Sequence, residues 1–261
     1  MGHPELREHW SRVCGWKMFA RISDESALEP RPSVVLVHGL AVSTRYMMPL
    51  ARELAPAWRV YAPDLPGYGR SESPRRALSI QALAEVLHLW ISSMRLRATI
   101  LIANSMGCQI AVEYMLRCRH RVQACVMLGP TMDAYARNTP AQVWRLLRDQ
   151  FHEPPSLVPL QAFDYLRFGP IRTMTTFYTG LSHDMLGRSA QVKVPTLVMR
   201  GANDTIVSQR WAETVAHSMP GGELVVVPGA GHALNYNSPE FVGNEVGRFW
   251  ARVSQRNLRY A

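Results

Sequence analysis

Six short apolar runs, each rich in β-branched residues, recur along this chain of 261 residues. They are residues 34–37, 59–62, 98–102, 123–128, 194–200 and 223–227. Such runs are typical of buried strands, and segments between them carry apolar residues at helical spacing, as at Leu83, Leu87 and Ile91. Strands that alternate with helices predict an α/β fold with a doubly wound, mostly parallel sheet, whose active residues lie at the carboxyl ends of the strands.

Two further features complete this plan. Residues 10–14 and 16–22, separated near Gly15, predict an antiparallel hairpin at an edge of the sheet. Residues 131–191 lack strand character, and their apolar spacing predicts helices over 141–151, 157–168 and 171–181. A stretch of that length inside a compact domain is expected to be functional. We therefore expect a core of residues 1–130 and 192–261, with a helical cap over 131–191 inserted into it.

The residues after the run at 98–102 place a serine where a strand turns into a helix. They read Ala103, Asn104, Ser105, Met106 and Gly107, and helical spacing follows. A sharp strand-to-helix turn presents a serine hydroxyl at the edge of a sheet, with the helix N-terminus behind it. Small residues are needed two positions before and after the serine because the strand and helix backbones approach closely there. The spacing is that of the nucleophile elbow G-x-S-x-G, with alanine at the first small position.

Three other segments supply what such a serine needs. One strand ends in His38-Gly39, another is followed by a turn with Asp204, and a third leads into a glycine-rich loop with His232. The order serine, aspartate, histidine is that of the α/β-hydrolase triad. With the turn at residues 64–71, the chain from about residue 10 to residue 253 resembles the α/β-hydrolase superfamily, in its serine-nucleophile branch with a helical cap.

The resemblance and the chemistry assign the same roles. Ser105 needs a base because a free hydroxyl is a poor nucleophile at neutral pH; His232 would be that base, and Asp204 would orient the imidazole. The backbone N–H groups of Met106 and Leu40 would form the oxyanion hole. The resemblance implies no cofactor and no metal.

Other polar residues have competing interpretations. Asp133 is an alternative to Asp204, since some members of the superfamily place the carboxylate after the preceding strand. We expect Asp64 to be structural and His38 to hold the oxyanion loop. His183 and Asp184, in the expected cap, are expected to be solvated.

The aromatic residues of the expected cap carry a further prediction. We expect most of them to pack between cap and core and some to line an apolar substrate site. They are Trp144, Phe151, Phe163, Tyr165, Phe168, Phe177 and Tyr178.

The leading hypothesis is a hydrolase of small-to-medium carboxylic esters or lactones that acts through an acyl-enzyme. Ser105 excludes the haloalkane dehalogenases and most epoxide hydrolases of this superfamily, which use an aspartate at the elbow. A carbon–carbon bond hydrolase of the meta-cleavage type has a similar elbow, but Ala233 stands where that group typically has tryptophan. A cofactor-free perhydrolase or haloperoxidase would use the same triad. The alternative from another class is a ligand receptor on this fold.

Charge and composition restrict the partners. The net charge is +9, yet the 29 basic residues are scattered and only Lys17 and Lys193 are lysines. We therefore expect no nucleic-acid partner and a small-molecule substrate that resembles an ester. No apolar run approaches membrane-spanning length, and the first ten residues lack the apolar core of a secretory signal, which favours the cytoplasm. The sequence leaves the oligomeric state open.

The cysteines show neither metal-ligand nor disulfide-scaffold spacing. The chain has four of them, Cys14, Cys108, Cys118 and Cys125. Cys118 and Cys125 are expected to be buried free thiols.

Overall fold

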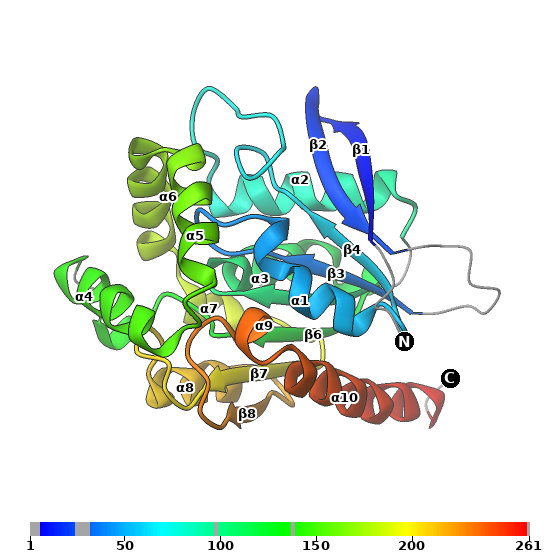
Figure 1. The fold of residues 1–261 in the computed structure, drawn as a ribbon. Helices are drawn as coiled ribbons and strands as arrows, with labels where there is room; N and C mark the ends of the chain where they lie inside the picture. Colours follow the sequence, from blue (N-terminus) through cyan, green and yellow to red (C-terminus); the bar gives the residue numbers. More distant parts are fainter. Residues whose placement is uncertain (1–5, 24–31, 97–98, 137–138, 260–261) are drawn as a thin grey trace.

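The computed structural model describes residues 6–23, 32–96, 99–136 and 139–259 (Figure 1). Its strands are β1 (Arg7–Val13), β2 (Trp16–Ile22), β3 (Ser33–Val37), β4 (Arg59–Pro63), β5 (Thr99–Asn104), β6 (Val122–Leu128), β7 (Thr196–Gly201) and β8 (Glu223–Val227). Its α-helices are α1 (Thr44–Leu54), α2 (Ile80–Ser93), α3 (Met106–Cys118), α4 (Thr139–Asp149), α5 (Leu157–Phe168), α6 (Pro170–Ser182), α7 (Met185–Ser189), α8 (Gln209–Ser218), α9 (Leu234–Asn237) and α10 (Pro239–Arg259).

All eight strands form one sheet in the order β1-β2-β4-β3-β5-β6-β7-β8. The pairs β1–β2 and β2–β4 are antiparallel, and the strands from β4 to β8 are parallel to one another. The predicted α/β sheet and its edge hairpin are therefore confirmed. Ala98, the first residue of one predicted run, lies outside the described residues.

The parallel strands read as unbroken apolar runs because both of their faces are buried. Alternate residues of β3 belong to different clusters, with Val34 and Leu36 on one face and Val35 and Val37 on the other. Helices α1 and α10 pack on the first face, and α2, α3 and α8 pack on the second. This layering fixes the carboxyl ends of β3, β5, β7 and β8, where the candidate site residues lie.

Helices occupy most of the chain between the neighbouring strands β6 and β7. Helix α5 has the predicted bounds, α4 and α6 begin one or two residues before the predicted starts, and α7 was not predicted. Figure 1 shows α4, α5 and α6 together on one side of the sheet. Ser43, which precedes α1, ties α5 to the core because its hydroxyl donates a 2.6 Å hydrogen bond to the buried Asp164 carboxylate. None of the described helices is long and apolar enough to span a membrane.

Candidate active site

Ser105 lies at the turn between β5 and α3, in a backbone conformation that serine rarely adopts. Its φ is 56° and its ψ is −124°, so the residue is strained. The turn is held by the Ser105 N–H, which donates to the carbonyl of Leu128 at 2.9 Å, and by the Cys108 N–H, which donates to the carbonyl of Ser105 at 2.9 Å. Strain of this kind persists only where the surroundings fix the residue in place.

The small residues around Ser105 are required by close backbone approach. A Cβ added to Gly107 would lie 2.6 Å from the carbonyl oxygen of Val37 and 2.7 Å from that of His38. A Cβ on Gly39 would lie 3.1 Å from the Cβ of Ser105. Ala103 is fully buried in β5 and belongs to the core cluster on the α3 side, which leaves little room for a larger side chain.

His232 and Asp204 form a buried pair beyond the ends of β8 and β7. The imidazole Nδ1 lies 2.8 Å from Asp204 Oδ2, and Asp204 Oδ1 accepts hydrogen bonds from the N–H groups of Ile206 and Val207, each at 2.8 Å. A Cβ on Gly129 would lie 2.8 Å from the imidazole, so this glycine leaves room for the ring. The aspartate is thereby fixed on one side while its other oxygen faces the histidine.

Asp133, the alternative acid, does not contact His232. It is fully buried and forms a 2.8 Å ion pair with Arg145. It also accepts hydrogen bonds from the N–H groups of Tyr135 and Ser208, at 2.8 and 3.2 Å. Of the two carboxylates, the structure places Asp204 against the imidazole.

The other nitrogen of the His232 ring is available for chemistry. His232 Nε2 is buried and makes no hydrogen bond with any described residue, Ser105 included. Burial opposes the charged imidazolium, but the charge and hydrogen bond of Asp204, aided by Asp149 and Glu153, raise the pKa of His232 to about 9. Hydrogen bonds between catalytic groups are often long in ligand-free enzymes and tighten only around the substrate.

Leu40 and Met106, whose backbone N–H groups are the expected oxyanion donors, line the same space as Ser105. Met106 is the first residue of α3, so its N–H has no partner within the helix. Leu40 lies in the loop that His38 holds, since His38 Nε2 accepts a 3.1 Å hydrogen bond from the N–H of Leu65 and Nδ1 lies 3.0 Å from the carbonyl oxygen of Gly39. Burial lowers the pKa of His38 and favours its neutral form, as these contacts require.

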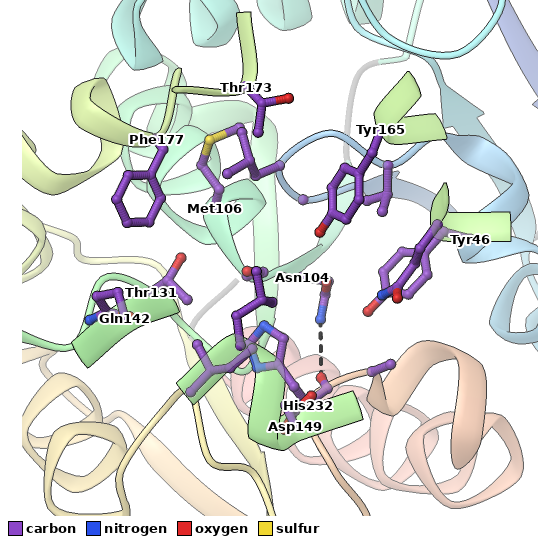
Figure 2. A pocket seen from close by; sticks show the side chains of 18 of the residues that line it. Tyr46, Asn104, Met106, Thr131, Gln142, Asp149, Tyr165, Thr173, Phe177 and His232 are labelled. Atoms are coloured by element: carbon purple, nitrogen blue, oxygen red, sulfur yellow. Dashed lines mark hydrogen bonds between the residues drawn. The ribbon is translucent and has the colours of Figure 1, made fainter. Parts of the chain in front are cut away.

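One cavity of about 510 Å³ joins these groups (Figure 2). Ser105, Met106, Leu40 and His232 line it, and its remaining wall is largely apolar. Figure 2 shows Tyr165 and Phe177 around the same space as Met106 and His232. No arginine or lysine is among the described residues that line the cavity.

Two carboxyl groups from the segment after β6 reach this cavity. Glu153 Oε1 accepts a 2.7 Å hydrogen bond from the N–H of Ala233, directly after His232, and Oε2 accepts one from Asn237 at 2.9 Å. Burial raises the pKa of Glu153 to about 7, although both donors favour its charged form. Burial also raises the pKa of Asp149, which lies beside it. The sequence did not predict either residue, because no motif in the neighbouring sequence indicates that a carboxylate will be buried by a loop far along the chain.

His183 corrects one prediction. It is buried rather than solvated, and its Nε2 lies 2.8 Å from Glu113 Oε1. Arg188 donates two hydrogen bonds to the same carboxylate, at 2.9 and 2.6 Å. Asp184 is exposed, as predicted, and caps α7 by accepting a hydrogen bond from the N–H of Gly187.

Asp64 has the structural role expected of it. Its Oδ1 accepts a 2.7 Å hydrogen bond from the backbone N–H of Thr44, and its Oδ2 accepts one from the backbone N–H of Arg70 at 2.8 Å. The carboxylate thus joins the start of α1 to the turn after β4. Cys118 and Cys125 are buried free thiols, as predicted.

The predicted packing of the cap aromatics is partly wrong. Tyr165 and Phe177 line the cavity, and Phe168 stacks on Tyr68 with 4.3 Å between ring centroids. The other four are more than half exposed, although the Arg45 guanidinium of α1 lies over the Phe163 ring, 4.3 Å from its centroid. They are Trp144, Phe151, Phe163 and Tyr178.

Comparison with known proteins identifies the family of this chain. The model of the alpha/beta hydrolase family matches residues 34–245. The carboxylesterase YbfK of Bacillus subtilis (strain 168) is 25% identical over 236 residues, which cover 84% of this chain and 80% of that protein. The pimeloyl-[acyl-carrier protein] methyl ester esterase of Nitrosomonas europaea is 25% identical over 238 residues, covering 80% and 92% of the two chains.

A solved structure extends the likeness to the fold. The enol-lactonase from Burkholderia xenovorans LB400 superposes with a TM-score of 0.78 at 19% identity, covering 93% of this chain and 100% of that one. From the family match and the eight-stranded sheet with its flanking helices, we conclude that this chain belongs to the alpha/beta hydrolase family.

Proposed function

We propose that this protein is a serine hydrolase that cleaves small-to-medium carboxylic esters or lactones through an acyl-enzyme. The observation that carries the proposal is the strained Ser105, which shares one largely apolar cavity with His232, whose ring is held by the buried Asp204. Relatives named as a carboxylesterase and a methyl ester esterase support the ester class. The lactone class is supported by the fold shared with an enol-lactonase.

In the proposed first half-reaction, Ser105 Oγ attacks the carbonyl carbon and its proton passes to His232 Nε2. Asp204 stabilises the imidazolium through Nδ1 and holds the ring in place. The N–H groups of Leu40 and Met106 bind the oxygen as it becomes negative, and losing one such donor typically costs about 3 kcal/mol of barrier. When the carbon–oxygen bond breaks, His232 returns its proton to the leaving oxygen.

Water completes the cycle by the same steps. It attacks the acyl carbon, gives a proton to His232, and the acid leaves as the proton returns to Ser105 Oγ. We assign α4, α5 and α6, within residues 131–191, to a cap that shapes the acyl site, because Leu146, Tyr165 and Phe177 supply its apolar wall. The chemistry itself is carried by residues of the core.

Labelling with a fluorophosphonate tests the proposal. The reagent should add one group to the protein, peptide mapping should place it on Ser105, and Ser105→Ala should remain unlabelled. A series of p-nitrophenyl esters should be hydrolysed by the unsubstituted protein only. Labelling elsewhere, or unlabelled protein with an intact fold, would contradict the proposal and favour a ligand receptor. Assays with a vinylogous diketone and with peroxide plus a carboxylic acid separate the carbon–carbon hydrolase and perhydrolase alternatives.

A further inference from the structure

Helices α4, α5 and α6, with the short 3₁₀ helix after α4, expose a set of large apolar side chains. We call it the outer face and define it by Trp144, Leu147, Phe151, Leu166, Ile171 and Tyr178. Phe151, Leu166 and Ile171 are 88, 82 and 83% exposed. Elsewhere in the described chain large exposed apolar side chains are scattered, as at Leu89 and Phe241. Large apolar side chains exposed together on neighbouring helices mark a site of interaction.

Helix α4 carries apolar side chains on two sides, one of which lines the cavity while the other is exposed. Val143 and Leu146 line the cavity. Trp144, Leu147 and Phe151, which follow one another at helical spacing through α4 and the short 3₁₀ helix after it, are exposed. A helix that packs only against its own protein is polar on its outer side.

The charges on this part of the chain are sorted by sign. All carboxylates within residues 139–182 are buried, namely Asp149, Glu153 and Asp164. Arg148 and Arg167 are exposed there, and the Arg167 guanidinium donates a hydrogen bond to the carbonyl of Gly69. A surface that joins exposed aromatic and aliphatic side chains with arginines, and shows no carboxylate, fits an anionic lipid surface.

A second pair of arginines extends the positive charge beyond α6. Arg172, near the start of that helix, donates a 2.6 Å hydrogen bond to the carbonyl of Pro74. This contact places Pro74, which precedes the exposed Arg75 and Arg76 in the chain, beside the start of α6. Neither forms an ion pair with a carboxylate in the part of the chain that the structure describes.

The outer face is continuous with the mouth of the cavity. Val143, Leu166 and Met174 line the cavity and are also exposed, so apolar surface runs from the outside to the site of Ser105. An apolar substrate dissolved in a lipid surface could enter without crossing water if this face lay on that surface. Figure 1 shows α4 and α6 on the side of the molecule opposite the end of α10.

We propose that the outer face of α4, α5 and α6 docks on the surface of a bilayer that contains anionic lipids. Trp144, Leu147, Phe151 and Ile171 enter the boundary between headgroups and acyl chains, and Arg148 lies at the level of the lipid phosphates. The protein lies on the bilayer without spanning it. This binding goes beyond the proposed hydrolase activity and does not require it.

Sedimentation with vesicles tests the proposal. Wild-type protein should bind vesicles of phosphatidylcholine with 30% phosphatidylglycerol at least tenfold more tightly than pure phosphatidylcholine, and added NaCl should weaken that binding. Trp144→Ser combined with Phe151→Ser should lower binding at least tenfold. Phe241→Ser, which removes an exposed phenylalanine from α10, is the matched control and should bind as wild type. Melting temperatures confirm that each variant folds.

Substitutions of exposed charged residues provide a second test, because they leave the packing of the protein unchanged. Arg148→Glu should weaken binding to the anionic vesicles about fivefold or more, because each basic residue near such a surface contributes about 1 kcal/mol. Arg256→Glu, the same change at the exposed end of α10, should have no effect. Ser105→Ala should bind like the wild type, which separates docking from catalysis.

Two results would overturn the proposal. One is wild-type protein that does not sediment with the anionic vesicles at physiological salt. The other is a dimer in light scattering that Trp144→Ser with Phe151→Ser dissociates without changing sedimentation, which would assign the outer face to a second copy of the chain. Loss of ester hydrolysis with intact sedimentation would leave the docking proposal standing and contradict only the proposed function.

Discussion

Glu153 Oε1 accepts a 2.7 Å hydrogen bond from the backbone N–H of Ala233, so a carboxyl group from the segment between α4 and α5 holds the residue next to His232. A Cβ on Gly231 would lie 2.5 Å from the same oxygen, which shows how closely the histidine loop passes over it. The imidazole is therefore positioned from two directions, by Asp204 and by this carboxyl group. Both also contribute to its raised pKa.

This arrangement predicts a shift in the pH profile. The proposed base must be neutral, so kcat/KM should rise with pH through the pKa of His232, which is about 9. Glu153→Gln removes a nearby negative charge, lowers that pKa and should move the acid limb to lower pH. Glu213→Gln, the same change on the exposed side of α8, should leave the profile in place. If Glu153→Gln has the same pH profile as the wild type, the charge of Glu153 does not influence the pKa of His232.

The same residue predicts how stability depends on pH. The folded-state pKa of Glu153, about 7, lies above its ordinary value of 4.5, so the protonated form favours folding. Its contribution to the free energy of unfolding is fully present below pH 4.5 and is lost as the pH rises through 7. Thermal unfolding across this range should show a smaller loss of melting temperature for Glu153→Gln than for wild type.

Because the backbone at Ser105 is strained, substitutions of this residue should affect activity and stability differently. Ser105→Ala should lower kcat by about 10⁴-fold or more with little change in melting temperature, because the strained turn remains. Ser105→Gly should be equally inactive but more stable than Ser105→Ala, by about 1 kcal/mol, since glycine adopts this conformation without strain. If the alanine variant keeps more than a tenth of the activity, Ser105 is not the nucleophile.

Substitutions of the two candidate acids, Asp204 and Asp133, should have different effects on activity and stability. Asp204→Asn should lower kcat by about 10⁴-fold, because only Asp204 contacts His232. Asp133→Asn should keep most activity and lose about 1–3 kcal/mol of unfolding free energy, because it weakens a buried pair with Arg145. Steady-state kinetics with chemical denaturation measure both effects. The reverse order in kcat would assign the acid to Asp133.

The close backbone contacts of Gly107, close to Ser105 at the turn from β5 to α3, give a prediction that a second glycine can control. Gly107→Ala places a Cβ within 2.7 Å of two carbonyl oxygens and should cost about 1–3 kcal/mol together with most of the activity. Gly247→Ala, in α10, meets nothing within 4 Å and should stabilise by about 1 kcal/mol. Ala103→Gly should remain active, whereas Ala103→Val should not. A stable, active valine variant would show that β5 and α3 are less tightly packed here than the structure indicates.

The cavity wall should control substrate choice. Phe177→Ala should change KM and the preferred acyl chain length with the fold intact, because its ring lines the cavity. Phe168→Ala should instead lower stability by about 3 kcal/mol, because its ring is buried against Tyr68. Kinetics on a graded ester series test the difference. An unchanged chain-length profile for Phe177→Ala would move specificity to the core loops around Leu40.

Local patterns predicted the core and the order of the site residues because each signal lies within a few positions. The strand at Val34 is apolar on both faces, and Ser105 follows its strand directly. His183 was misjudged because its partner, Glu113, lies 70 residues away. Glu153 was missed for the same reason, since its burial depends on the loop at Ala233, 80 residues away. The outward turn of Trp144 and Phe151 also depends on how whole helices pack.

The path of the chain between β6 and β7 has a consequence for how this protein can diversify. The two strands are direct neighbours, with Cys125 opposite Thr196, yet the described part of the chain between them contains four α-helices. Loop-closure entropy grows slowly with length, at about 0.6 kcal/mol per doubling, so this connection can be lengthened, shortened or exchanged at small cost to the sheet. The limit on such grafts is local: a transplanted segment must still provide a hydrogen-bond acceptor beneath the N–H of Ala233.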